Sequence, residues 1–157
     1  YGYAITTYVG QNLGAKEYQR IRKGVHSGVY MALITSIVIS GVMVITGRSI
    51  LSLFVSGEAG QVKQVLDIAY KYLFIMAIFL WVLYLLYVYR SAIQGLGNTL
   101  IPLASGVVEF CMRVGVALLL PKLIGEDGIF YAEICAWSGA AILLIVSYMV
   151  IIRKYKE

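Results

Sequence analysis

The chain has 157 residues, of which 61% are hydrophobic and 13% are charged, and its formal net charge is +5. A typical soluble domain is roughly 45–50% apolar and about 25% charged, so this composition excludes a water-soluble globular domain. No soluble segment carries a basic motif interleaved with aromatic residues that stack on bases. We therefore expect a lipid bilayer around the chain and no nucleic acid as a partner.

Residues 1–14 contain an incomplete apolar segment. The stretch from Tyr1 to Val9 is apolar, but a spanning helix needs about 20 residues, and the polar Gln11 and Asn12 follow at once. The chain starts without an initiator methionine, a basic n-region or a signal-peptide cleavage site. We expect these residues to be the end of a helix that begins upstream, in a longer protein.

Four long apolar stretches with few charges fill most of the remaining chain. Each is long enough to cross a bilayer as a helix. Runs such as residues 142–146 are apolar on every side, unlike the alternating strands of a membrane β-barrel. The sequence predicts an all-α integral membrane protein with four full transmembrane helices plus the end of a fifth. The predicted full helices cover residues 24–47, 62–94, 99–121 and 127–153.

Helix-boundary signals mark the third of these helices. Gly95 begins a tight turn in which Asn98 or Thr99 can cap the next helix. Pro102 falls in the first turn of that helix, where a missing N–H is tolerated. Pro121 marks its other end.

Basic residues indicate the orientation, because Lys and Arg in short loops are retained on the cytoplasmic side whereas acidic residues matter little. One side carries eight basic residues, and the other side carries four, accompanied by Glu58, Asp67, Glu126 and Asp127. The sequence therefore predicts a cytoplasmic C-terminus in the plasma (cytoplasmic) membrane. The larger set is Lys16, Arg20, Arg22, Lys23, Arg90, Arg153, Lys154 and Lys156, and the smaller set is Arg48, Lys63, Lys71 and Lys122.

Charged residues inside the predicted helices are the most informative polar positions. Glu109 and Arg113 lie four residues apart, so they share a helix face and can pair. A charge at bilayer depth costs at least about 2.5–3.5 kcal/mol and is tolerated mainly where it faces protein or water. The pair therefore either lines a transport path and responds to protons or cations, or locks neighbouring helices together.

Three other polar residues lie nearer the helix ends. Arg90 can extend toward the membrane interface, and with Gln94 it is the better candidate for a cytoplasmic gate or helix clamp. Glu133 lies close to the outer end of the last helix, where simple contact with water is favoured over a functional role.

An aromatic group in the second long stretch suggests a cage for organic cations, because ring faces attract positive charge. Most of these rings point in different directions around the helix. Trp81 and Tyr84 alone share a stripe with Val88, and lipid or core packing explains this stripe equally well.

The sequence shows no catalytic or metal-binding constellation. Cys111 and Cys135 lie inside predicted helices, and the single histidine, His26, stands alone, so no metal-ligand spacing occurs. The glycine-rich turn at residues 95–98 lacks the Lys-Ser/Thr of a phosphate loop. We expect no enzyme activity, no resident metal and no cofactor.

Several segments together resemble the multidrug and toxic compound extrusion (MATE) family of transporters. Residues 7–16, with Arg20 after them, resemble the end of the family's eighth helix, and residues 90–102 look like its junction between helices ten and eleven. The charged pair at residues 109–113 and the run at residues 132–137 resemble the pattern of helices eleven and twelve. The likeness covers the chain in the family's order.

The resemblance implies most of the second lobe of a 12-helix secondary transporter. Such an antiporter exports an organic cation or other amphiphile in exchange for inward Na⁺ or H⁺, by rocking around a midplane site. Its partners would be the bilayer, a small-molecule substrate and the N-terminal lobe, without which this chain should not transport. The implied correspondence is the end of helix eight for residues 1–14, then helices nine to twelve for residues 24–47, 62–94, 99–121 and 127–153.

One departure from the family pattern concerns the coupling acid. Members with a cation site in the second lobe use an acid buried in helices seven and ten, whereas residues 62–94 carry only Asp67, at their edge. The coupling carboxylate is therefore expected in the absent first lobe. Gln11 and Asn12 match the family positions, and we expect them to serve helix packing or a polar turn at the cytoplasmic gate.

Two alternatives stay open at this point. A lipid-linked oligosaccharide flippase of the same superfamily would need a strongly cationic cavity for pyrophosphate, which Arg113 beside Glu109 supports only weakly. A non-transporting membrane scaffold would use the same pair only as a structural contact. A membrane enzyme is least favoured, because convergent acids, histidines or metal ligands near an interface are missing.

Overall fold

The computed structural model describes residues 1–57, 59–125 and 127–155, and within these ranges it contains helices and no strand. Among the described residues, four helical segments are long and apolar enough to cross a membrane, namely α2, α3, the combined α4 and α5, and α6. The prediction of an all-α membrane fold with four long apolar helices is thus confirmed. The helices are α1 (Gly2–Gly14), α2 (Tyr18–Ser52), α3 (Ala59–Gly95), α4 (Leu100–Leu119), α5 (Pro121–Ile124) and α6 (Gly128–Arg153).

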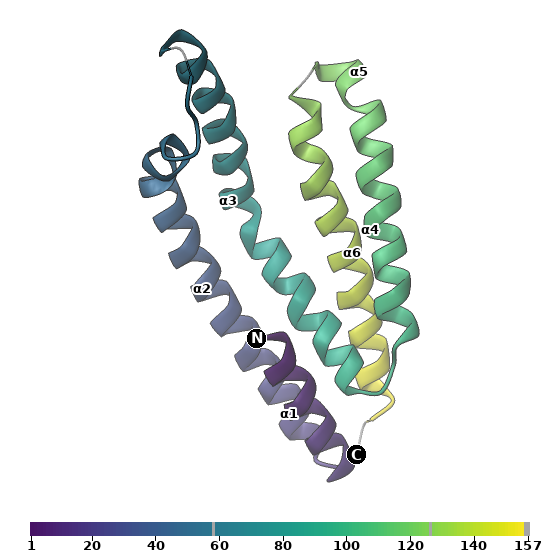
Figure 1. Ribbon diagram of the computed structural model, residues 1–157. Coiled ribbons are helices and arrows are strands. Elements are labelled where there is room, and N and C mark those ends of the chain that lie inside the picture. Colours follow the sequence, from purple (N-terminus) through teal and green to yellow (C-terminus); the bar gives the residue numbers. More distant parts are fainter. Residues whose placement is uncertain (58, 126, 156–157) are drawn as a thin grey trace.

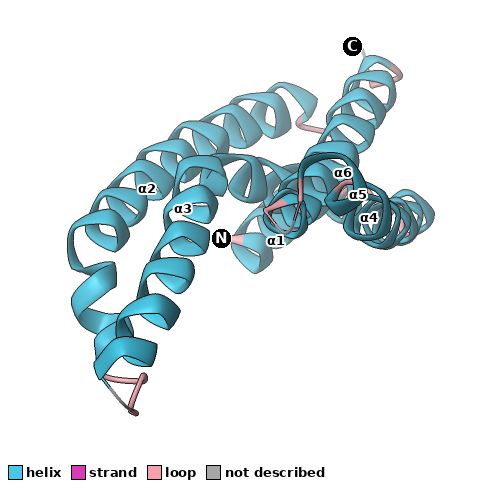
Figure 2. Cartoon of the chain, turned by 90° about the horizontal axis from the view of Figure 1, so that it is seen from above, coloured by secondary structure: helices cyan, strands magenta, loops and turns pink. Residues whose placement is uncertain are grey.

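The long helices form two pairs that meet along α3 and α6 (Figure 1). α2 packs along α3, and α4 packs along α6. The short α1 contacts both α2 and α3, and it lies beside the lower half of α2 in Figure 1. In the end-on view of Figure 2, α4 lies at the far side of α6 from α2. α3 and α6 are therefore central, and α2 and α4 flank them.

α2 extends beyond the hydrophobic stretch that predicts it at both ends. α2 begins at Tyr18 rather than at residue 24, and it ends at Ser52 rather than at residue 47. Its first turns carry several charges, yet Ile21 and Val25 are buried there. Long basic side chains can cover apolar surface while their charged heads reach water, so the helix continues through the interface.

Two connections depend on backbone chemistry. α3 ends in a Schellman motif, in which the Asn98 N–H donates to the Ile93 carbonyl at 3.2 Å and Gly97 adopts a φ of 81°. The Asn98 side chain then accepts a bond from the Ile101 N–H at 3.1 Å. Asn98 therefore provides the cap that the sequence assigned to either Asn98 or Thr99.

Pro121 does more than mark the end of a helix. α4 ends at Leu119, and Pro121 starts the short α5. Because proline is accommodated in the first turn of a helix, the chain can turn here into a second helical segment. α5 then leads through Gly125, whose φ is 80°, toward α6.

The core lies where α1, α2, α3 and α6 meet. Each of these helices contributes a side chain that is fully withdrawn from solvent, namely Val9, Ile21, Ile93 and Leu144. Gly95 permits a close approach, since a Cβ added there would lie 2.7 Å from the Val9 Cβ. Helices in a bilayer associate through close packing rather than through the hydrophobic effect, and small residues at their crossings permit that packing.

Surface ion pairs join the helices at the end that carries fewer basic residues. Arg48 of α2 pairs with Asp67 of α3, and Lys71 of α3 pairs with Asp127 at 2.6 Å, just before α6. Partial charge balance on this side agrees with the mixed loop composition. Three charges of the sequence count, Glu58, Glu126 and Lys156, lie outside the described residues.

Candidate functional site

One face of α4 carries polar side chains through the middle of an otherwise apolar helix. Ser105, Glu109 and Arg113 follow one another at intervals of four residues, so they lie on the same face. Ser105 is fully buried, and its hydroxyl donates to the Pro102 carbonyl at 2.7 Å, on the same helix. Bonds from a serine to the preceding turn are common inside helices, and this one keeps the hydroxyl oxygen free to accept.

Glu109 is the centre of the site. Its Oε1 accepts a hydrogen bond from Arg113 Nη2 at 3.0 Å, and its Oε2 accepts one from Arg90 Nη2 at 2.9 Å. Arg90 lies on α3, and the same nitrogen donates to Ser105 Oγ at 3.2 Å. The predicted pairing of Glu109 with Arg113 is present, and a second arginine from another helix joins it.

Arg113 extends the site to α6. Its Nη2 donates to Glu133 Oε1 at 2.8 Å, and its Nε lies 2.7 Å from Glu133 Oε2. The sequence analysis favoured simple contact of Glu133 with water, whereas the structure pairs this carboxylate with Arg113. We call Arg90, Glu109, Arg113 and Glu133 the charge network.

The charge network alternates in sign and has no formal net charge. Its side chains are partly shielded, from 19% exposure at Glu109 to 41% at Arg113. Charges inside a bilayer are tolerated when they pair with one another. Removing one partner lowers the stability more than the intact pair raises it, because the other charge is left without a partner. The network therefore links α3, α4 and α6 by ion pairs, in addition to the packing between these helices.

The interactions that the structure shows at this site are ion pairs and hydrogen bonds. Within residues 1–57, 59–125 and 127–155, no group of three or more His, Cys, Asp or Glu residues could hold a metal ion. Both carboxylates already accept hydrogen bonds from guanidinium groups. These ion pairs thus join side chains of α3, α4 and α6.

The other residues singled out from the sequence lie away from the charge network. Gln94 and Gln11 are exposed, and Asn12 Nδ2 donates to the Tyr8 carbonyl at 2.8 Å within α1. Arg90 extends toward α4, whereas Gln94 is exposed, and the prediction that they act as a cytoplasmic gate or helix clamp stays a prediction. The weaker candidates are Trp81, which is 45% exposed, and Tyr84, whose ring centroid lies 6.2 Å from that of Tyr1.

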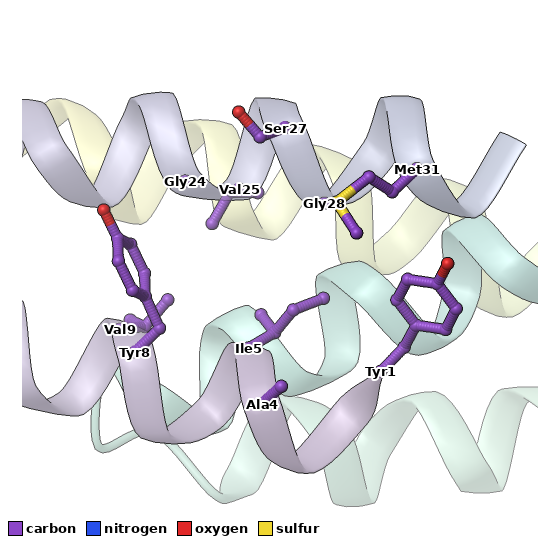
Figure 3. A pocket seen from close by; sticks show the side chains of 10 residues that line it. All are labelled: Tyr1, Ala4, Ile5, Tyr8, Val9, Gly24, Val25, Ser27, Gly28 and Met31. Atoms are coloured by element: carbon purple, nitrogen blue, oxygen red, sulfur yellow. The ribbon is translucent and has the colours of Figure 1, made fainter. Parts of the chain in front are cut away.

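A separate pocket of about 390 Å³ lies between α1 and α2 (Figure 3). Tyr1 and Tyr8 flank it on α1, with Ile5 between them. Gly24 and Gly28 of α2 face this space. The sequence analysis missed this pocket, and its only sequence signal is the four-residue spacing of the two glycines.

All four members of the charge network were singled out from the sequence, but Ser105 and the contacts between helices were not. Ser105 could have been found, because it continues the spacing of Glu109 and Arg113 on one helix face. The contacts of Glu133 and Arg90 could not, because they join residues 20 and 19 positions apart on different helices. Such contacts depend on how the helices are packed.

The fold and the charge network define a multi-pass membrane protein with paired charges inside its helical bundle. A protein-family model described as MatE matches residues 1–119, which include α1 to α4. The chain belongs to the MatE family of membrane transporters, and the resemblance found in the sequence is confirmed. A comparison with curated proteins gave no match.

Proposed function

We propose that this transporter is a secondary active antiporter that exports organic cations, drugs or other amphiphiles in exchange for Na⁺ or H⁺. Membership of the MatE family supports transport as the kind of activity. The excess of basic residues on one side supports insertion in the plasma (cytoplasmic) membrane with a cytoplasmic C-terminus. The N-terminal lobe is the proposed partner, and this chain alone is proposed to be inactive.

The charge network is the observation that carries the proposal. Alternating access requires groups of helices to move relative to one another within the membrane. Glu109 has two arginine partners on two different helices. A shift of α4 relative to α3 can therefore release Arg90 while Arg113 still neutralises Glu109, so that the carboxylate is not left as an isolated charge in the bilayer.

We assign distinct roles to the members of the network on this basis. Glu109 and Arg113 form the coupling pair that moves as one unit, because both belong to α4. Arg90 is the gate, because its bonds to Glu109 and Ser105 join α3 to α4. Glu133 keeps Arg113 neutralised from the side of α6.

The coupling cation is proposed to bind elsewhere, in the N-terminal lobe. Na⁺ at Glu109 would approach two guanidinium groups that lie within 3.0 Å of the carboxylate. Like charges at such distances repel strongly in a medium of low polarity. The network therefore responds to the helix movement that ion exchange drives, and it does not itself carry the ion.

The pocket between α1 and α2 is proposed to accept the apolar part of the substrate. Its lining is largely apolar, with the rings of Tyr1 and Tyr8 at its sides (Figure 3). Small-molecule sites are typically apolar cavities with a few polar groups, and tyrosine ring faces attract organic cations.

The two alternatives are less well supported. A flippase for lipid-linked oligosaccharides would need uncompensated positive charge for pyrophosphate, whereas each arginine of the network is paired with a carboxylate. A non-transporting scaffold would need the network only for stability. One experiment distinguishes a scaffold from a transporter.

The test is efflux of a fluorescent organic cation from cells that express the full-length protein, under imposed Na⁺ or proton gradients. Glu109→Gln keeps the shape of the side chain but removes its charge, and we expect it to lower the efflux rate about tenfold or more at equal amounts of protein in the membrane. Arg48→Gln is the matched control, because it removes an exposed ion pair between α2 and α3 and should leave efflux within about twofold.

Unchanged efflux in Glu109→Gln would still support a transporter, but it would contradict a coupling role for the charge network. An absence of gradient-dependent efflux with every cation tested would contradict antiport and favour the flippase or the scaffold.

A further inference from the structure

A second basic cluster lies apart from the charge network, where the start of α2 meets the end of α6. A pocket of about 300 Å³ there is lined by Arg22, His26, Tyr89, Tyr148 and Arg153, among others. An adjoining pocket of about 410 Å³ shares Arg22 and His26 and adds Lys23. In the described part of the chain, neither lining includes an acidic residue. The space between these helices is therefore cationic.

Arg22 has hydrogen-bonding capacity to spare. Its Nη2 donates to the Ile152 carbonyl at 3.0 Å, near the end of α6. Its Nε is withdrawn from solvent and has no hydrogen-bond partner within the described ranges. A guanidinium carries five N–H donors in a planar fork that matches phosphate oxygens. Arg22 thus fixes the end of α6 with one nitrogen and keeps further donors for a ligand.

Tyr148 offers a second unpaired donor in the same pocket. Only 5% of this residue is exposed, and its ring centroid lies 5.4 Å from that of Tyr89. Its hydroxyl has no hydrogen-bond partner in the part of the chain that the structure describes. A buried hydroxyl without a partner destabilises the folded state, because it has lost its hydrogen bonds to water. A ligand oxygen admitted between Arg22 and Tyr148 would remove this penalty.

Apolar helix surface adjoins the pocket, which α1 does not line within the described ranges. α1 contacts α3 two residues beyond Tyr89, where Thr6 donates to the Ser91 carbonyl at 3.1 Å. The helix faces that continue from the pocket are apolar and exposed, with Tyr30 on α2 at 67% and Val146 and Met149 on α6 at 55% and 50%. A ligand of this surface would combine an anionic group with hydrocarbon.

We propose that this pocket binds the phosphate of an anionic phospholipid, whose acyl chains run along the exposed faces of α2 and α6. Arg22 and the Tyr148 hydroxyl hold the phosphate, while Lys23 and Arg153 supply long-range attraction. The bound lipid stabilises the contact between the start of α2 and the end of α6. Only the assignment to the cytoplasmic leaflet, which is rich in anionic lipid, rests on the orientation proposed above.

The test measures lipid binding by thermal unfolding of the full-length protein in micelles of a neutral detergent. A ligand that binds the folded state raises the unfolding midpoint in a concentration-dependent way. Phosphatidylglycerol is titrated against phosphatidylcholine and against inorganic phosphate. We expect a saturable rise with phosphatidylglycerol and none with phosphatidylcholine or with millimolar inorganic phosphate.

Three variants locate the site. Arg22→Gln should weaken the apparent affinity for phosphatidylglycerol about tenfold or more, as expected for a lost bond to a charged group. Tyr148→Phe removes only the hydroxyl and should weaken the affinity roughly three- to tenfold. Arg20→Gln is the matched control, since it removes a charge from the same end of α2, where Arg20 faces Glu17 at 3.7 Å, and it should change the affinity less than twofold.

Equal losses of affinity for phosphatidylglycerol in Arg20→Gln and Arg22→Gln would overturn the proposal in favour of diffuse charge attraction. An equal midpoint rise with inorganic phosphate, lost in the same variants, would overturn the lipid assignment in favour of a soluble anion. If Arg22→Gln does not fold, Tyr148→Phe decides alone, and an unchanged affinity in that variant contradicts the site.

Discussion

Glu109 is the residue on which the site depends, because its two carboxylate oxygens face arginines from two helices. The spacing of Glu109 and Arg113 predicts their contact, since residues four apart on a helix are neighbours. The same reasoning fails for Glu133, which meets Arg113 only because α6 packs along α4. Residue-level prediction from sequence therefore reaches contacts within one helix and stops at contacts between helices.

The first prediction concerns the stability of the charge network. Arg113→Gln leaves Glu109 with one arginine and Glu133 with none, and we expect it to lower the free energy of unfolding by about 1–3 kcal/mol, less than the 3–5 kcal/mol typical of fully buried pairs. Thermal unfolding in detergent measures this change. The exposed pair of Arg48 provides the control, since Arg48→Gln should cost at most about 1 kcal/mol. Equal effects of the two substitutions would show that the network adds no more to stability than an exposed ion pair.

The second prediction concerns the close approach of α1 to α3. In Gly95→Ala the new Cβ would lie 2.7 Å from the Val9 Cβ and 2.8 Å from the Thr6 carbonyl oxygen, so backbone has to move. We expect a loss of about 1–3 kcal/mol, as for other overpacked contacts. Gly106→Ala on α4 is the control, because no atom lies within 4 Å of its added Cβ. A Gly95→Ala protein as stable as the Gly106→Ala protein would contradict this packing.

At the scale of the helices, apolar length predicts which segments are helical but not where they stop. The stretch 24–47 predicts the core of α2, whereas the helix itself spans Tyr18–Ser52 because its charged first turns still bury Ile21. Likewise, Pro121 correctly signals a boundary, but no local pattern shows that a second helix begins there. Helix ends depend on caps and neighbouring contacts more than on hydrophobicity.

The third prediction tests the cap of α4. Asn98→Ala removes the side-chain oxygen that accepts the Ile101 N–H, and the usual cost of such a loss is about 0.5–2 kcal/mol. Thr99→Ala serves as the comparison, because Thr99 makes no side-chain capping bond. Unfolding midpoints of the two variants should therefore differ, with Asn98→Ala the lower. The reverse order would assign the cap to Thr99.

For the whole molecule, the sequence predicts the class of fold more completely than the arrangement. Composition and apolar length are sufficient to predict a helical membrane protein, because long stretches with few charges have the length that a spanning helix needs. The central position of α3 and α6 follows from packing across the whole chain (Figures 1 and 2). The pocket at Arg22 and Tyr148 arises in the same way, from helices that are distant in the sequence.

The fourth prediction concerns the orientation in the membrane. In full-length protein with Cys111 and Cys135 replaced by serine, a single cysteine is introduced at Lys16, in the turn after α1, or at Ser56, in the connection between α2 and α3. A membrane-impermeant maleimide should label Ser56→Cys in intact cells and Lys16→Cys only after permeabilisation, because the basic side is retained in the cytoplasm. The opposite labelling pattern would invert the proposed orientation.

An ion gradient is proposed to drive export through a transporter whose movement depends on the charge network. The test is transport of a fluorescent organic cation in proteoliposomes that contain the full-length protein. A Na⁺ or proton gradient is imposed, and the unchanged protein is compared with the variants Glu109→Gln and Arg48→Gln. We expect gradient-driven movement of the cation that is retained in Arg48→Gln and reduced about tenfold or more in Glu109→Gln. Movement that is independent of both gradients, or equal in all three proteins, would contradict it.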